Sequence, residues 1–282
     1  MEETVVQDSS NKVVTVRLFD GTAVKLECCD RLASTSALAK EYARAGYPDR
    51  YAVFTEKQSL SPITKSKLSE GEYEEGVFLS VILRPSLFPS QLGLLAPLAS
   101  VALITALDEH IEEKPKIGWV SDVYINGIHQ GGVSVEGKLD SFSSYEYMII
   151  SFAIRLDEKS FSPRMTDMIK QVFESENFSV PMIIAKEILA KFFTVYSSLK
   201  TPEKYMDIYE DRFVLTGKKI KHIVGDKKET VRVLGINKET CALTVETKDK
   251  TISVTSPSGV IIPRKIKQDK EAKLIKDSDK KS

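Results

Sequence analysis

The sequence predicts an α+β fold for about its first 200 residues, followed by a small unit built only from β-strands. Short runs rich in β-branched and aromatic residues alternate with long apolar stretches of helical spacing, which indicates a mixed architecture. Some of the strands are joined by hairpin turns rather than by helices, so a strictly parallel series of strand–helix–strand units does not fit. After residue 213 only short strand-like runs follow, and these mark the second unit.

The first elements are expected near the N-terminus. Strands are predicted at 13–18, 24–26 and 51–55. The first two flank Asp20-Gly21, a pair typical of turns. A helix is predicted over 37–46, because Ser34 or Ser36 can accept a backbone N–H at its start and Gly46 can end it in the left-handed conformation.

The middle of the chain is expected to hold the longest elements. Strands are predicted at 77–84, 119–125, 132–137 and 145–156, and helices at 90–112, 164–177 and 181–199. Asn126-Gly127 predicts a tight hairpin within 116–140, because both residues accept the positive φ angles of a two-residue turn. Residues 57–76 are polar and without period, so they are expected to form a long loop, which in a compact domain is usually functional or disordered.

The C-terminal region predicts a small barrel and a tail. Strands are expected at 219–224, 230–236, 242–247 and 251–254. Several short strands within about 50 residues are typical of a small closed barrel. Residues 264–282 hold eight basic and four acidic residues with almost no apolar ones, so they are expected to be disordered.

Composition excludes several classes of protein. The 282 residues include 40 Lys and Arg against 40 Asp and Glu, and this zero net charge argues against a generic binder of nucleic acid. Cys28, Cys29 and Cys241 form no CxxC pair and only three His are present, so we expect no metal site and a reducing compartment. The apolar stretch 92–107 contains a proline and is too short to span a bilayer, and the acidic start carries no leader, so we expect a cytoplasmic protein without a membrane partner.

The most informative stretch is IGWVSDVYINGIHQGGVSVEG at residues 117–137. It resembles the biotin–protein ligase signature K-W-P-N-D-(hydrophobic)-Y-x-N-G, which is followed by G-G-(I/V)-L-(I/V)-E. The matching residues are Trp119, Asp122, Tyr124, Asn126, Gly127, Gly131, Gly132 and Glu136. Further matches lie in family order at 34–36 (D-S-T-N element), 56–58 (E-x-Q), 78–85 (strand ending in L-R-P), 92–107 (helix) and 213–247 (SH3-like barrel).

This resemblance covers about residues 24–263 and implies a fold and a reaction. The implied fold is a central mixed sheet flanked by helices (24–205), with an SH3-like domain at 213–263; residues 1–23 would be an extension and 264–282 a tail. The implied reaction joins biotin to ATP, with Mg²⁺, as biotinoyl-5′-AMP, and a lysine of a carboxylase carrier domain then attacks this anhydride. No confident catalytic residue can be named, because the departures from the family pattern fall on the nucleotide elements.

Three elements that would contact the phosphates are altered. The family loop G-R-G-R-x-G-R aligns with residues 61–67, where every glycine is replaced and only Lys65 and Lys67 keep a positive charge. The lysine of K-W-P-N-D falls on Gly118, with Lys116 two residues earlier. The G-x-G-x-N element aligns with 151–155, where Arg155 is a candidate new cation.

The biotin side of the resemblance is better kept. It assigns Ser34, Thr35 and Gln58 to biotin as hydrogen-bonding residues, and Gly131 and Gly132 as positions where the backbone approaches the flat ligand. The alternatives stay open, because the first two residues can simply cap a helix and the glycines can simply form a β-bulge.

The resemblance also assigns two residues to the nucleotide. These are Trp119 and Asp122, which are the aromatic residue and the carboxylate that survive from the K-W-P-N-D motif. Trp119 can instead be a plain core aromatic. Asp122 is harder to explain as a structural residue, because an unpaired carboxylate is costly to bury.

Three functions are compatible with this pattern. The first is a ligase homologue with lost or strongly reduced adenylation, which would act as a binding or scaffold subunit for an unknown protein partner and need no cofactor. The second is an active ligase in which Lys65, Lys67, Lys116 or Arg155 replaces the missing cations. The third is a biotin sensor without chemistry. About two dozen residues precede the core, too few for the DNA-binding domain of the family's repressors, and a homodimer is possible.

Overall fold

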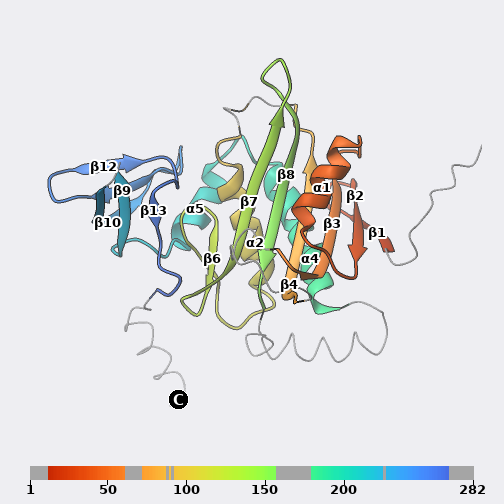
Figure 1. The fold of residues 1–282 in the computed structure, drawn as a ribbon, viewed down its shortest axis with the longest axis horizontal. Helices are drawn as coiled ribbons and strands as arrows, with labels where there is room; N and C mark the ends of the chain where they lie inside the picture. Colours follow the sequence, from red (N-terminus) through yellow and green to blue (C-terminus); the bar gives the residue numbers. More distant parts are fainter. Residues whose placement is uncertain are drawn as a thin grey trace, which may run out of the picture.

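The computed structural model describes residues 12–60, 72–86, 89, 92–156, 179–224 and 227–266. Two sheets organise this part of the chain, a large one with helices on both faces and a small one built from the C-terminal strands (Figure 1). The fold class predicted from the sequence is therefore confirmed: an α+β core with a mixed sheet, followed by a small β unit. The predicted helix at 164–177 lies outside the described residues.

The large sheet contains eight strands in the order β1-β2-β3-β4-β8-β7-β6-β5. The strands are β1 (Lys12–Arg17), β2 (Ala23–Cys29), β3 (Tyr51–Gln58), β4 (Glu74–Leu83), β5 (Lys116–Ile117), β6 (Asp122–Ile125), β7 (Ile128–Leu139) and β8 (Tyr145–Ile154). Only β2 and β3 pair in parallel, and helix α1 (Thr35–Arg44) connects them. The remaining neighbours are antiparallel, as hairpins such as Asn126-Gly127 require.

Helices cover both faces of this sheet because its central strands are apolar on both sides. On one face, α2 (Leu95–Leu107) and α4 (Val180–Tyr196) pack against strand residues such as Ala52 and Phe152. On the other face, Ala39 and Ala43 of α1 pack against Val53. Successive residues of a strand point to opposite faces, so both layers are encoded by the same strands. No described helix is long and apolar enough to cross a membrane.

The small sheet has the order β12-β11-β10-β9-β13. Its strands are β9 (Lys219–Val224), β10 (Lys227–Ile236), β11 (Leu243–Glu246), β12 (Thr251–Val254) and β13 (Val260–Ile261), and helix α5 (Glu203–Asp211) precedes it. This arrangement fits an SH3-like domain. The closed barrel predicted from the sequence is not found in the described residues, because β12 and β13 are short strands at opposite edges that do not pair with each other.

The end of the described chain departs from the predicted boundary of the tail. Arg264 and Lys265 pair with the hairpin between β6 and β7, through the bond from His129 N to Arg264 O (2.9 Å) and a bridge between Ile128 and Lys265. Ile266 is buried. Burial of this apolar side chain stabilises the packing of residues 264–266 against the rest of the protein. The remainder of the tail, 267–282, lies outside the described residues.

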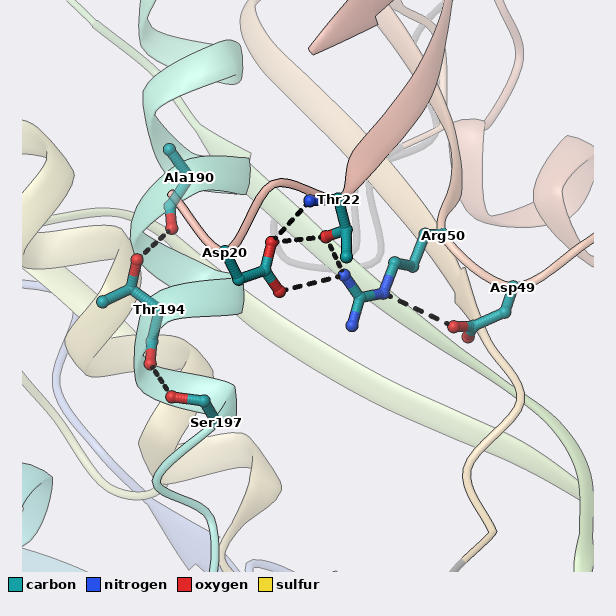
Figure 2. A network of polar contacts seen from close by, with 7 residues as sticks. All are labelled: Asp20, Thr22, Asp49, Arg50, Ala190, Thr194 and Ser197. Carbon is teal, nitrogen blue, oxygen red and sulfur yellow. Dashed lines mark hydrogen bonds and ion pairs between the residues drawn. The ribbon is translucent and has the colours of Figure 1, made fainter. Parts of the chain in front are cut away.

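A polar network holds the turn between β1 and β2 against the start of β3 (Figure 2). Asp20 accepts hydrogen bonds from Thr22 N (2.9 Å) and Thr22 Oγ1 (2.5 Å). Arg50 forms ion pairs with Asp20 (3.5 Å) and Asp49 (3.6 Å), and it donates to the Thr22 hydroxyl. Its guanidinium also lies 4.8 Å from the ring centroid of Phe193 on α4. One arginine therefore links the edge of the sheet to the helix layer.

We expect Arg50→Met to lower the free energy of unfolding by about 1 kcal/mol, because partly exposed ion pairs and a cation–π contact each contribute little but act together here. Urea denaturation followed by circular dichroism measures the change. Lys57→Met is the matched control, since Lys57 forms one exposed ion pair at 3.8 Å. A loss of equal size in both variants would show that the network around Arg50 adds nothing.

Candidate functional site

The N-terminus of α1 brings together three of the residues assigned to biotin. Ser34 caps the helix, and its hydroxyl oxygen accepts a hydrogen bond from Ala37 N at 3.2 Å. Thr35 is buried, and both its backbone N (2.8 Å) and its hydroxyl (3.2 Å) donate to Gln58 Oε1. Gln58 lies at the end of β3 and is also buried. Ser34 thus does cap the helix, whereas Thr35 and Gln58 form a buried polar pair.

Beneath Thr35 lies a row of hydroxyl groups that crosses the sheet. Ser80 on β4 is paired with Ser151 on β8, which is paired with Ser134 on β7; we call these three residues the serine row. The Ser80 hydroxyl lies 2.9 Å from Thr35 Oγ1 and 2.8 Å from Ser151 Oγ. At the end of the row, Ser134 Oγ is buried and has no hydrogen-bond partner among the described residues. A buried hydroxyl without a partner is costly, and such a group is suited to meet a polar ligand.

Sequence reasoning did not single out Ser80 and Ser134. A usable signal was present at Ser80, which interrupts the apolar run of β4. Both serines point to the α1 face, because Ser80 contacts Thr35 and the register places Ser151 and Ser134 beside it. Ser151 was treated only as a residue that replaces a family glycine. Its pairing with Ser80 shows that it belongs to the polar lining instead.

Gly131 and Gly132 lie in β7 at a place where neighbouring backbone approaches closely. A Cβ atom on Gly131 would lie 2.0 Å from Ala153 O, and one on Gly132 would lie 2.2 Å from Ser121 O. The register between β6 and β7 also shifts at this point, which marks a bulge. The close backbone contacts therefore explain why glycine occupies both positions, without a bound ligand.

Trp119 and Asp122, the residues assigned to the nucleotide, are both engaged within the protein. Trp119 is buried, and its indole N–H donates to Cys241 O of the C-terminal unit at 2.6 Å. The Asp122 carboxylate lies 3.3 Å from His129 Nε2. Residues 119–121, which the sequence assigned to a strand, form an irregular segment between β5 and β6. The strand prediction failed here because the segment's contacts come from residues far along the chain.

Gly118, where the family has its lysine, leaves no room for a side chain. A Cβ atom would lie 2.7 Å from Tyr124 Cε2 and 3.2 Å from Asp122 Cβ. The Tyr124 ring is held in place, because the ring is buried and its hydroxyl donates to Pro263 O at 2.8 Å. Burial, and then the nearby Asp122 carboxylate, raise the pKa of Tyr124, so the phenol keeps the proton that this bond uses. A Cβ atom at position 118 would therefore meet this aromatic ring.

The remaining candidate cations are scattered or paired. Lys116 is exposed on β5. Arg155 Nε lies 3.1 Å from Glu74 Oε1, and an Nη group of Arg155 donates to His129 O at 3.3 Å. Lys65 and Lys67 lie outside the described residues. Of the two candidate cations that the structure describes, Lys116 is therefore exposed on an edge strand and Arg155 is already paired with a carboxylate.

Glu136, the last residue of the signature, ties β7 to α1. It accepts from the Ser36 hydroxyl (3.1 Å) and from Lys40 Nζ (2.6 Å). Beside it lies an open hollow of about 280 Å³, lined by Lys40, Arg44, Glu136, Gly137, Lys138, Tyr147 and Ile149. No group of three or more potential metal ligands occurs among the residues that the structure describes.

Comparisons with known proteins point to one family. No family model matches the chain. The bifunctional ligase/repressor BirA of Bacillus subtilis is 28% identical over 130 residues, and that of Bacillus spizizenii is 26% identical over 131 residues. Each match covers 46% of this chain and 40% of the relative, so the match spans less than half the length of these curated relatives.

Solved structures share the fold over most of their length. The apo biotin protein ligase of Aquifex aeolicus superposes with a TM-score of 0.60 at 17% identity, covering 85% of this chain and 98% of that one. The same enzyme in complex with biotin and ATP gives 0.60 at 16% identity, covering 84% and 97%. A biotin protein ligase-like protein of unknown function from a Silicibacter species gives 0.56 at 11% identity, covering 85% and 97%.

At these identities the solved structures show that the fold is shared. The segment of about 130 residues matched in the two ligase/repressors shows similarity in sequence as well. The order of the signature motifs agrees with both. The chain is thus similar to biotin protein ligases in fold over most of its length, and to the ligase/repressors in sequence over the matched segment.

Proposed function

We propose that this chain is a biotin–protein ligase-like protein whose adenylation activity is lost or strongly reduced, and that it acts by binding. The observation that carries the proposal is the absence of the signature lysine at Gly118, together with the close approach of the Tyr124 ring to this position. In the resemblance, a lysine at this position reaches the reacting carboxylate and phosphate. Here the Tyr124 ring takes the room that its Cβ would need. Loss of one preorganised charge at a transition state costs about 3–4 kcal/mol, or about 10²–10³ in rate.

The rest of the signature segment supports the same proposal. Trp119 donates to Cys241 O, Tyr124 donates to Pro263 O, and the Tyr209 hydroxyl donates to Val120 O at 2.9 Å. These bonds fasten the segment to helix α5 and to the C-terminal unit. A segment that would face a nucleotide in a ligase is used here as a junction between two parts of the fold.

A second candidate function, biotin binding without chemistry, is favoured by the polar lining under α1. Thr35, Gln58 and the serine row place several hydrogen-bonding groups on one face of the sheet. Ser134 Oγ remains unsatisfied among the described residues. The flat ureido ring of biotin carries matching donors and acceptors, so this lining suits it better than it suits a phosphate.

The test is an adenylation and transfer assay run beside the Aquifex aeolicus ligase. The protein is incubated with biotin, ATP, Mg²⁺ and a carboxylase carrier domain, and mass spectrometry follows the carrier. We expect transfer at least about 10³-fold slower than with the reference enzyme. Transfer at a comparable rate would overturn the proposal in favour of an active ligase that uses Lys65, Lys67, Lys116 or Arg155. Titration calorimetry with biotin alone tests the second candidate function. If no heat of binding is measured at millimolar biotin, biotin binding is excluded.

Restoring the family lysine should not restore the reaction. We expect Gly118→Lys to leave transfer undetected and to lower the melting temperature, because the new Cβ meets the Tyr124 ring and the ring cannot move without breaking its bond to Pro263 O. Differential scanning fluorimetry and the transfer assay measure both effects. Gly118→Ala is the companion variant, since it adds the Cβ alone. Transfer gained by Gly118→Lys, with unchanged stability, would show that the lysine position is still open.

A further inference from the structure

The zero net charge of the chain conceals a strong separation of charge along it. Residues 1–212 contain 23 Lys and Arg against 31 Asp and Glu. Residues 213–282 contain 17 Lys and Arg against 9 Asp and Glu. The C-terminal part is therefore strongly basic, and its described strands show where the basic side chains gather. Charge separation of this kind points to a partner of opposite sign.

Four of these cations share the outer face of the small sheet. In β9 the buried residues Ile220 and His222 alternate with exposed Lys219 and Lys221. In β10 the exposed residues Lys228 and Arg232 lie on the same outer face, because Arg232 is the register partner of Lys219. Neighbours on one face lie about 5–7 Å apart. None of the four forms an ion pair with another described residue, and the acidic register partner on this face is Glu246, opposite Arg232.

Apolar side chains are interleaved with these cations. Ile223 follows Lys221 on the same face of β9 and is 38% exposed, and Ile261 of β13, 43% exposed, is the register partner of Lys221. Leu234 continues the face along β10 and is 42% exposed. Hence this outer face is basic and apolar at once, and we call it the β9–β10 face; its residues are Lys219, Lys221, Ile223, Lys228, Arg232, Leu234 and Ile261.

We propose that the β9–β10 face docks an acidic segment of a partner protein that also carries aliphatic side chains. The four cations, none of which forms an ion pair with a described residue, attract carboxylates. The exposed aliphatic residues gain by burial against similar residues, at about 25 cal/mol per Å² of apolar surface. The inference names the partner surface for the binding role proposed above and rests on that role. A protein is the expected partner because the β9–β10 face carries both positive charge and exposed apolar surface.

A nucleic acid is the less suitable occupant. Phosphates would use the cations, but they leave Ile223, Leu234 and Ile261 without a partner. Proteins that bind single strands offer aromatic rings on which bases stack. The described residues of the small unit contain one aromatic ring besides the histidine, that of Phe213, and it is buried.

Fluorescence anisotropy with the full chain tests the proposal. The probe is a labelled synthetic peptide that alternates Glu with Ile, and a peptide that alternates Glu with Ser is its comparison. We expect the Glu/Ile peptide to bind more tightly, and Lys219→Glu with Lys221→Glu to weaken it at least about 10-fold. Ile223→Ser with Ile261→Ser should remove the preference for the Glu/Ile peptide. Circular dichroism checks that each variant is folded.

The matched control is Lys248→Glu with Lys250→Glu, which makes the same charge change in the turn between β11 and β12, at residues that do not belong to the face. We expect it to leave peptide binding unchanged. An equal loss in the control would overturn the proposal, because bulk charge would then explain binding. A labelled thymidine oligonucleotide that binds as tightly as the peptide would overturn it in favour of a polyanion, and no binding of either peptide would also overturn it.

Two further outcomes are distinguishable. Self-association of the chain in sedimentation experiments, abolished by Lys219→Glu with Lys221→Glu, would assign the face to a second copy and overturn the proposal. If the chain transfers biotin at a normal rate while the peptide still binds here, the proposed function fails and the surface stands. If transfer is absent and the peptide does not bind, the proposed function stands and the surface fails.

Discussion

Gly131→Ala is expected to destabilise the protein by about 3 kcal/mol or more, at the upper end of what one added methyl group costs in a packed interior. The new Cβ would lie 2.0 Å from Ala153 O and 2.9 Å from Ile154 Cα, which are backbone atoms of β8. A side chain can rotate away from a clash, but a paired strand cannot. Relief therefore requires that β7 separates from β8 at the centre of the large sheet.

Gly235→Ala is the matched control for this measurement. Gly235 also lies in a strand beside a bulge, but nothing lies within 4 Å of its Cβ position. Both substitutions restrict the unfolded chain equally, so the difference between them isolates the clash in the folded state. Urea denaturation followed by circular dichroism gives both free energies of unfolding.

The result also decides between the two interpretations of Gly131 and Gly132. If the glycines serve the fold, Gly131→Ala loses stability before any ligand is added. A variant of normal stability that has lost biotin binding would instead mean that the backbone is kept bare for the ligand. The 2.0 Å approach of Ala153 O favours the first interpretation.

Local signals in the sequence predicted much of the fold. The apolar run at 77–84 is found in β4, and the run at 145–156 in β8. Asn126-Gly127 forms the expected turn, with φ angles of 53° and 71°. These features depend on residues close in sequence, where alternation of side chains and turn conformation decide the outcome. The predicted helix at 90–112 was too long, because α2 spans Leu95–Leu107.

Features that depend on distant residues could not be predicted. Trp119 meets its partner Cys241 only in the folded chain, which is why residues 119–121 are not the strand that their composition indicates. The contact between the Tyr124 ring and Gly118 could not be predicted either. The sequence shows that a lysine is missing at position 118, but not that a Cβ there would meet this ring. Closure of the small sheet depends on which edges meet, and the short strands carry no signal for it.

The segment 118–124 is therefore central to the proposed loss of chemistry, and Trp119→Ala is the variant that probes it most strongly. We expect a loss of about 3–5 kcal/mol, as for other large aromatic residues removed from a core. Trp119 is 3% exposed and connects the large sheet to the C-terminal unit through the bond to Cys241 O. Circular dichroism during urea denaturation measures the loss.

Trp119→Phe separates packing from hydrogen bonding. It keeps most of the buried ring and removes the indole N–H, which leaves Cys241 O without this donor, so we expect a loss of about 1–3 kcal/mol. Trp119 is also the one tryptophan of the chain, so its fluorescence in the wild type reports on the junction. Fluorescence and circular dichroism should then change at the same urea concentration, because the two parts share one hydrophobic core. A fluorescence change at lower urea would mean that the junction opens on its own. The segment would then be free to move, which a nucleotide-binding element needs and a structural junction does not.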